Sequence, residues 1–324
     1  MSTTTPSLRP AVLLAFAAIY VIWGSTYLAI RFAIETIPPL LMAGWRVVLA
    51  GGLLYGALRL AGVPRPSVPE VRTAAGLGVL MIAGAQGLVT WAEQLVPSGL
   101  AALMITSMPL VLVGLDVAFF GAARPGPRTL VGLGLGLVGV ASLVGPSEGA
   151  VHPVGAAALL LSTLCWAIGS LLSRGAAMPR SPWMSAAVQM LAGGVVLLGA
   201  ATVAGEWSVF ELSAVSALSL GSFLYLTTFG SIVALSAYLF LLRETSAAAV
   251  GTYAFVNPVI ALGLGWAAGE VMSASSLVGG TLVIGAVVLI HLEHNRSPVP
   301  RRARAEISQA RPATPCPSAA GATD

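Results

Sequence analysis

Ten long apolar runs constrain this chain more than any other feature of its sequence. Each has roughly the 20 apolar residues that one helical crossing of a bilayer requires. The runs cover residues 11–31, 39–60, 72–92, 98–121, 127–145, 153–173, 182–204, 213–241, 246–267 and 274–292. Short separators rich in helix breakers, such as Ile37-Pro38-Pro39, lie between them. We therefore predict an all-α membrane protein with ten transmembrane helices.

The composition excludes a soluble globular protein. Of the 324 residues, 57% are hydrophobic and 9% are charged, whereas soluble domains have about 45–50% apolar and about 25% charged residues. The net charge of +4 does not indicate nucleic-acid binding, because the arginines are scattered between apolar runs. The chain has no Walker A loop, no Gly-x-Ser-x-Gly elbow and no His-Glu-x-x-His motif. We therefore expect no enzyme activity, no cofactor and no metal site.

The distribution of arginine predicts the orientation in the membrane. With a cytoplasmic N-terminus, 14 of the 16 basic residues fall on the cytoplasmic side, and only Arg31 and Arg46 do not. The outer side receives Glu35, Glu93, Glu148, Glu206, Glu211 and Glu270. We expect both termini to be cytoplasmic, with residues 1–10 as a short N-terminal segment. Residues 297–324 form a polar Arg/Pro-rich sequence, which predicts a disordered cytosolic tail.

An internal repeat links the two halves of the chain. Trp23 lies eight residues before Arg31, and Trp166 lies eight residues before Arg174. Each half contains five apolar runs, in residues 11–145 and 153–293. Because five is odd, the second half must enter the bilayer from the opposite side, which gives two inverted five-helix repeats.

The later parts of the two halves also correspond. Residues 98–109 resemble residues 246–258, and residues 132–140 resemble residues 279–287, with an offset that drifts only from 149 to 147. Inverted repeats of this kind build carriers that work by alternating access, with the substrate site near the bilayer midplane. Chance similarity between Gly/Ala/Leu-rich segments remains the alternative explanation.

Several motifs at the helix ends are similar to those of a known family. They are Trp91-Ala92-Glu93-Gln94, Ser162-Thr163-Leu164-Cys165-Trp166-Ala167-Ile168-Gly169-Ser170, Phe229-Gly230-Ser231-Ile232-Val233-Ala234 and Tyr253-Ala254-Phe255-Val256-Asn257-Pro258. Over residues 10–293 the chain resembles the EamA family of the drug/metabolite transporter superfamily, and within it the YedA-type exporters. The resemblance implies an inner-membrane carrier that exports small organic metabolites, amino acids or amphipathic drugs.

The resemblance leaves several properties open. It names no substrate, and it does not separate proton-coupled transport from a facilitative uniporter, or a monomer from a homodimer. A protein that does not transport solutes, such as a lipid scramblase, is the alternative from another functional class. It would need a polar groove open to lipid.

Five residues are candidates for substrate binding. Trp23 and Trp166 are related by the repeat and lie about midway along their helices, where an indole ring offers a flat apolar wall. Gln86, Tyr253 and Asn257 would supply polar contacts in a central cavity. The alternative for the tryptophans is packing between helices or against lipid.

Four further residues are candidates for gating or structural roles. Arg46 lies within an apolar helix, so we expect it to need a polar partner. Glu93 is expected near the outer surface, either as a solvated carboxylate or in cation attraction or proton coupling. Pro109 and Pro258 are expected to interrupt their helices at corresponding places. Asp116, near an inner helix end, is expected to reach towards the interface.

Overall fold

The computed structural model describes residues 10–121, 126–143, 152–245, 250, 252–271 and 273–294. Most of the predicted N-terminal segment and the whole predicted tail lie outside these residues. The first half contains α1 (Pro10–Ala33), α2 (Pro39–Leu60), α3 (Val68–Gly78), the π-helix η1 (Val79–Gln86), α4 (Gly87–Ala92), α5 (Ser98–Ile105), α6 (Met108–Phe119) and α7 (Pro127–Leu143). The second half contains α8 (Pro153–Leu172), α9 (Pro182–Val203), α10 (Glu206–Val209), the 3₁₀ turn η2 (Leu212–Ala214), α11 (Ala217–Tyr225), the π-helix η3 (Leu226–Val233), α12 (Ala234–Glu244), α14 (Tyr253–Ala267) and α15 (Ala274–His294). No strand occurs among the described residues.

The helices have the lengths and surfaces of membrane helices. Seven continuous helical segments are long and apolar enough to cross a bilayer, with mean hydropathies from 1.5 to 2.0. Three shorter apolar helices accompany them, at Pro127–Ser142, Val256–Ala267 and Leu277–Leu289. Large apolar side chains such as Leu14 and Leu137 are exposed, at 71% and 70%. Apolar surface of this kind suits contact with lipid and confirms the predicted all-α membrane class.

Most helix bounds agree with the apolar runs, but α3 begins at Val68, four residues before its run, and the fourth run is divided between α5 and α6. The eighth run differs in the opposite sense. The eighth run was expected to start at residue 213, but α11 begins at Ala217. The side chain of Ser216 accepts a hydrogen bond from the backbone N–H of Ser219 at 3.0 Å and so caps the helix. The four preceding residues are apolar enough to extend the run but lie outside the helix, because hydropathy does not detect a cap.

Two π-helical segments mark equivalent places in the two halves. The segments η1 and η3 have eight residues each, and they are separated by the 147-residue offset of the sequence repeat. The segment η1 packs on α8 and α9, and η3 packs on α1 and α2. Each π-helix therefore contacts the first two helices of the other half. Short π-helical stretches are frequent at functional sites.

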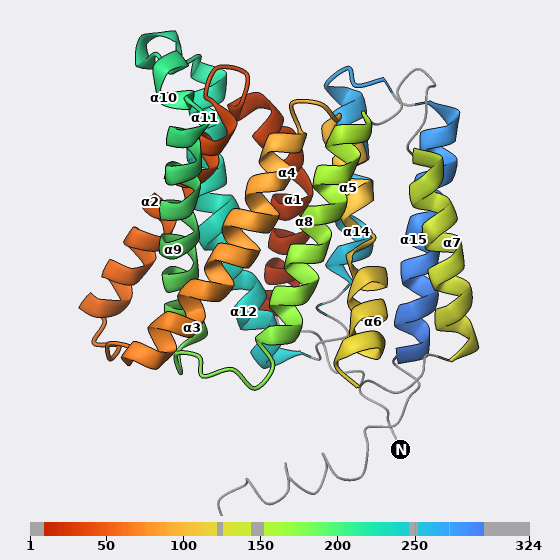
Figure 1. Ribbon diagram of the computed structural model, residues 1–324, viewed down its shortest axis with the longest axis horizontal. Helices are drawn as coiled ribbons and strands as arrows, with labels where there is room; N and C mark the ends of the chain where they lie inside the picture. The colour runs from red at the N-terminus through yellow and green to blue at the C-terminus, as the bar shows by residue number, and fades with distance from the viewer. Residues whose placement is uncertain are drawn as a thin grey trace, which may run out of the picture.

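The two halves enter the bundle in opposite directions. Arg31, near the end of α1, lies beside the start of α5, and Gly155, at the start of α8, packs against Val96 just before α5. The bundle therefore has two ends. We name the end where α1 finishes the Glu270 end, at the top of Figure 1, and the end where α6 finishes the Asp116 end, at the bottom.

Equivalent helices from the two halves pack against each other at two places. Helix α2 lies along α9, and α7 lies along α15, and Figure 1 shows the second pair at one side of the bundle. Glycines allow the first contact, since a Cβ atom on Gly44 would come within 2.8 Å of Leu198, and one on Gly194 within 2.6 Å of Val48. Small residues at helix interfaces are typical of packing in membranes.

Candidate functional site

An aromatic cluster of Trp23, Tyr238 and Tyr253 joins α1, α12 and α14. The ring centroid of Trp23 lies 5.4 Å from that of Tyr238 and 5.2 Å from that of Tyr253. The indole N–H of Trp23 donates a hydrogen bond to the carbonyl of Gly230 at 3.2 Å. Tilted and edge-on rings at these distances attract one another. Trp23 is therefore held against η3, and its two described ring contacts are with tyrosines and not with Trp166.

The segment η3 also receives Arg46 from α2. The side chain of Arg46 is 8% exposed, and its Nε donates to the hydroxyl of Ser231 at 3.0 Å. That hydroxyl donates in turn to the carbonyl of Leu226, five residues earlier, at 3.0 Å. A π-helical turn contains one residue more than an α-helical turn, which brings the hydroxyl of Ser231 near a carbonyl five residues earlier. Arg46 thus has the polar partner that its position in an apolar helix requires.

Asn257 ties α14 to α1. With its amide nitrogen facing two carbonyl groups, it donates to the carbonyl of Tyr253 at 3.2 Å and to that of Tyr20 at 3.3 Å. The hydroxyls of Tyr20 and Thr252 lie 2.6 Å apart. Trp23, Tyr253 and Asn257 are therefore gathered at the contact between α1 and α14.

The other two residues expected at the site lie on the opposite pair of elements. Trp166 is on α8 and Gln86 is the last residue of η1, and these elements pack together. Both side chains are half-buried. The predicted set is therefore divided between two repeat-related places, one at η3 and one at η1.

The two prolines behave differently. The helix that contains Pro109 is broken just before it, because α5 ends at Ile105 and α6 begins at Met108. The hydroxyls of Thr106 and Ser107 donate to carbonyls of the preceding turn at 2.8 and 2.6 Å. Pro258 instead lies inside α14, which continues through it to Ala267. The proline itself therefore does not break α14, which begins after a turn at Thr252, and its ring removes only a single backbone donor there.

A groove opens between α1, α11 and α14. Its volume is about 450 Å³, and Phe32, Leu218 and Leu264 contribute to its largely apolar wall. The hydroxyls of Ser25 and Tyr225 lie 2.7 Å apart on that wall. An apolar wall with a few hydroxyl groups suits an amphipathic molecule.

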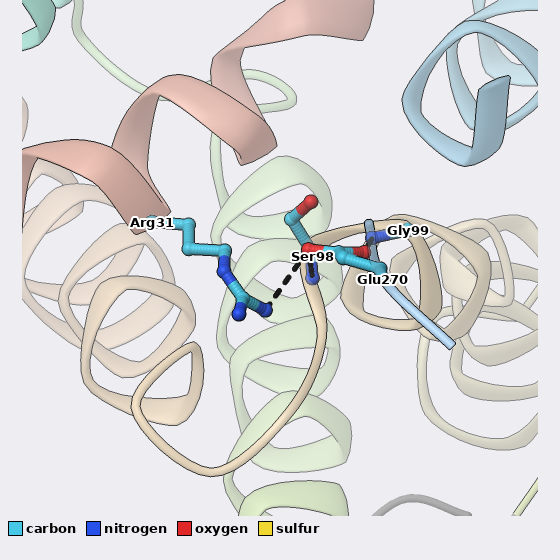
Figure 2. Close-up of polar contacts among 4 residues, drawn as sticks. All are labelled: Arg31, Ser98, Gly99 and Glu270. Atoms are coloured by element: carbon cyan, nitrogen blue, oxygen red, sulfur yellow. Dashed lines mark hydrogen bonds and ion pairs between the residues drawn. The ribbon is translucent and has the colours of Figure 1, made fainter. Parts of the chain in front are cut away.

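Glu270 closes one end of the bundle. Its Oε1 accepts from the backbone N–H of Ser98 at 2.9 Å and from Arg31 at 3.1 Å, and its Oε2 accepts from the N–H of Gly99 at 3.0 Å (Figure 2). These N–H groups open α5, and Pro97 before them gives no side-chain cap. A carboxylate at a helix N-terminus satisfies orphan donors and complements the helix dipole. Glu270 therefore joins α1, α5 and the end of α14.

Local sequence explains how Glu270 reaches this place. Helix α14 ends with Gly269 at φ 85°, a left-handed conformation that favours glycine. The N–H of Gly269 donates to Trp266 at 3.0 Å and that of Glu270 to Gly265 at 2.9 Å, which is the Schellman pattern of a helix end. A Cβ atom on Gly265 would lie 2.4 Å from Glu270 Oε2. Gly265 therefore leaves space for the carboxylate, and the left-handed turn at Gly269 directs Glu270 towards α5.

Glu206 repeats the same device at the same end. Helix α9 is followed by Gly205 at φ 74°, and the carboxylate of Glu206 accepts from the N–H groups of Leu40 and Leu41 at 3.2 and 2.8 Å. These residues open α2, which also lacks a side-chain cap. Glu206 and Glu270 thus each hold a helix of the first half from the second half. We call these two contacts the carboxylate clasps.

The Asp116 end has a weaker ion pair. Arg174, the repeat equivalent of Arg31, donates to Asp116 Oδ2 at 2.7 Å, with the side chains of Arg174 and Asp116 56% and 21% exposed. The expectation that Asp116 reaches towards the interface stays a prediction, and the structure adds its partner. It pairs with an arginine 58 positions away, which no pattern in the sequence brings near.

Sequence reasoning missed the clasps. The tripeptide Ala-Gly-Glu occurs at residues 204–206 and 268–270, each time directly after an apolar run. A glycine that ends a helix and is followed by a glutamate therefore indicates a carboxylate at a helix end. The sequence does not predict the partners of these carboxylates, the starts of α2 and α5, because they depend on which helices meet at that end.

Comparison with known proteins identifies the family. The model of the EamA-like transporter family matches residues 9–145 and again residues 153–292. The chain belongs to the EamA-like transporter family. The two matches show the two-repeat architecture that the internal repeat predicts.

Relatives with this architecture are named as transporters. The chain is 40% identical over 283 residues to the "Uncharacterized inner membrane transporter YedA" of Escherichia coli K12, which covers 86% of this chain and 90% of that one. It is 25% identical to the "Probable amino-acid metabolite efflux pump" of Salmonella typhimurium, over 84% and 91% of the two chains. A solved crystal structure with 20% identity covers 90% of this chain and all of its own, with a TM-score of 0.61, and supports the fold.

Proposed function

We propose that this protein is an inner-membrane carrier that exports small organic metabolites, amino acids or amphipathic drugs by alternating access. Ten spans in two inverted five-helix repeats would place the Glu270 end outside and both termini in the cytoplasm. The seven long and three shorter apolar helices support the span count, and the arginine distribution supports the orientation. Two relatives whose names describe transporters support the class.

The observation that carries the mechanism is the unequal closure of the two ends. The first-half helices α2 and α5 are held from the second half by Glu206 and Glu270 at one end. Among the described residues, the equivalent arginine at the other end makes an exposed ion pair with Asp116. Alternating access requires two such ends to open in turn around one site. The described structure therefore supports a state with its Glu270 end closed.

The substrate region is assigned to the aromatic cluster and the neighbouring η3. Trp23, Tyr238 and Tyr253 offer ring faces, and Arg46 and Ser231 offer polar groups beside them. Aromatic walls with few polar groups suit organic solutes of mixed character. Trp166 and Gln86 would take the equivalent role on the η1 side, as the repeat predicts.

Reconstitution of the full chain into liposomes tests the proposal. Uptake of labelled amino acids, nucleosides and a cationic dye should exceed that of empty liposomes for at least one probe. Trp23→Ala should reduce that uptake about tenfold or more, while Trp207→Ala, which alters a half-exposed residue in α10 at the surface, should not. Accelerated exchange of fluorescent lipids between leaflets, without uptake of any probe, would instead identify a lipid scramblase.

A further inference from the structure

Glu93 is a buried acid without a partner. It directly follows α4, at the boundary of the Val68–Ala92 span, and is 5% exposed. Within the part of the chain that the structure describes, neither of its carboxyl oxygens has a hydrogen-bond partner of normal geometry, and the same is true of the hydroxyl of Ser98, which is fully buried. Burial of a charged carboxylate without hydrogen bonds is very costly, so such groups are usually paired or neutral.

The charged groups around Glu93 are engaged elsewhere. Arg31 on α1 donates to Glu270 at 3.1 Å, and Arg46 on α2 donates to Ser231 at 3.0 Å. The phenol of Tyr27 on α1 also faces this region. His152, the exposed N-cap residue of α8, is engaged locally, because its Nδ1 accepts from the N–H of Val154 at 3.3 Å.

Glu93 and Glu270 differ in the hydrogen bonds that their carboxyl groups receive. Glu270 accepts from two backbone N–H groups and one guanidinium, so the protein replaces the water that a carboxylate loses on burial. Among the described residues, no hydrogen bond of normal geometry reaches either oxygen of Glu93, although the backbone of Arg31 lowers its pKa. Burial raises the pKa of the Glu93 carboxyl, and the nearby Glu270 raises it further, whereas Arg31 and Arg46 lower it.

We infer that Glu93 is a proton-binding site of the carrier. It is a neutral carboxylic acid while the Glu270 end is closed, and its O–H bond breaks to give a carboxylate and a proton that passes to water when that end opens. This inference rests on the proposed alternating access, and it links the opening of the Glu270 end to the release of one proton from Glu93. Opening of that end should therefore become easier as the pH rises.

Infrared spectroscopy of the full chain in lipid nanodiscs tests the inference without a substrate. The carbonyl stretch of a protonated carboxyl group should persist at about pH 7, well above the usual glutamate pKa of about 4.3. Labelling with ¹³C-carboxyl glutamate should shift this band. Glu93→Gln should remove it, and Glu211→Gln, which alters an exposed acid expected on the same side, should leave it intact.

A second variant covers the case in which Glu93→Gln does not fold. In Glu270→Gln the band should still be present but should disappear at lower pH than in the wild type, because the released Arg31 can pair with Glu93. A wild-type band that disappears in the ordinary glutamate range, or one that survives in Glu93→Gln, would overturn the inference. If liposomes still take up a probe while either of these results is found, the proposed carrier function is supported and only the proton-binding role of Glu93 is rejected.

Discussion

The two ends of the bundle differ in how they are held, although the repeat makes their residues equivalent. Arg31 and Arg174 occupy matching positions, yet Arg31 joins a buried carboxylate and Arg174 a partly exposed one. In Glu270 the side chain is 2% exposed, and in Asp116 it is 21% exposed. An ion pair whose carboxylate is buried and fully hydrogen-bonded resists separation more than one whose two partners are both exposed to water. Equivalent arginines are therefore present at both ends, but only Arg31 pairs with a buried carboxylate.

The residues that follow the glycines at the ends of two equivalent helices show what distinguishes the two ends of the bundle. Gly205 after α9 and Gly62 after α2 both have a left-handed conformation, at φ 74° and 79°. Glu206 follows the first, whereas Val63 follows the second. The backbone turn is thus common to both ends, and one side chain decides whether a carboxylate clasp can form. This comparison predicts which substitutions open which end.

Glu270→Gln should have the largest effect. It leaves Arg31 without its charge partner and removes the anion from the start of α5. Breaking a buried pair costs about 3–5 kcal/mol, and we expect about 3 kcal/mol because the side chain of Arg31 is 43% exposed. The thermal midpoint in lipid nanodiscs should fall accordingly.

A cysteine reporter shows whether this loss opens the Glu270 end. In a background without Cys165 and Cys316, Ser98→Cys places a thiol at a fully buried position beneath Glu270. Labelling by a maleimide should be slow in that background and fast when Glu270→Gln is added. Equal labelling rates would show that the clasp does not hold this end closed.

Gly265→Ala should have the second-largest effect. The new methyl group would lie 2.4 Å from Glu270 Oε2, so the carboxylate must move off α5. Overpacking of this kind costs about 1–3 kcal/mol. Gly263→Ala is the matched control two residues away, where a Cβ atom meets nothing within 4 Å, and it should not destabilise the protein. Similar thermal midpoints for the two variants would mean that the Glu270 carboxylate can avoid the new methyl group without losing its contacts with α5.

Glu206→Ala should have a smaller effect than either change at the Glu270 site. It removes a cap on α2 but leaves no unpaired arginine behind, so the loss should be about 1 kcal/mol, as for other helix caps. Glu211→Ala, at an exposed neighbouring position, should change the thermal midpoint little. If Glu206→Ala lowered the thermal midpoint more than Glu270→Gln, the ion pair with Arg31 would not be what makes the Glu270 clasp the stronger one.

The sequence predicts the helices far better than their meeting points. The apolar runs place nearly every helix, because membrane insertion depends on local hydropathy and length. They do not predict the π-helical turns at η1 and η3, which depend on contacts with the other half. Likewise Arg46 was recognised as needing a partner, but Ser231 lies 185 positions away. Pairing across such distances is decided by tertiary packing, which periodicity does not report.

Asp116→Asn should have the smallest effect, and it tests the comparison from its weaker side. The ion pair with Arg174 is short at 2.7 Å, but its arginine is 56% exposed, so water solvates both partners when they separate. Exposed pairs contribute about 0.2–1 kcal/mol, and we expect a loss of about 0.5 kcal/mol and no faster labelling of Ser98→Cys. Raising the salt concentration should reproduce this small loss in the wild type and leave the buried pair at Glu270 in place, because salt screens exposed charges more than buried ones. A loss as large as that of Glu270→Gln would contradict the ranking, since it would require Asp116 to be as strongly held as its buried counterpart.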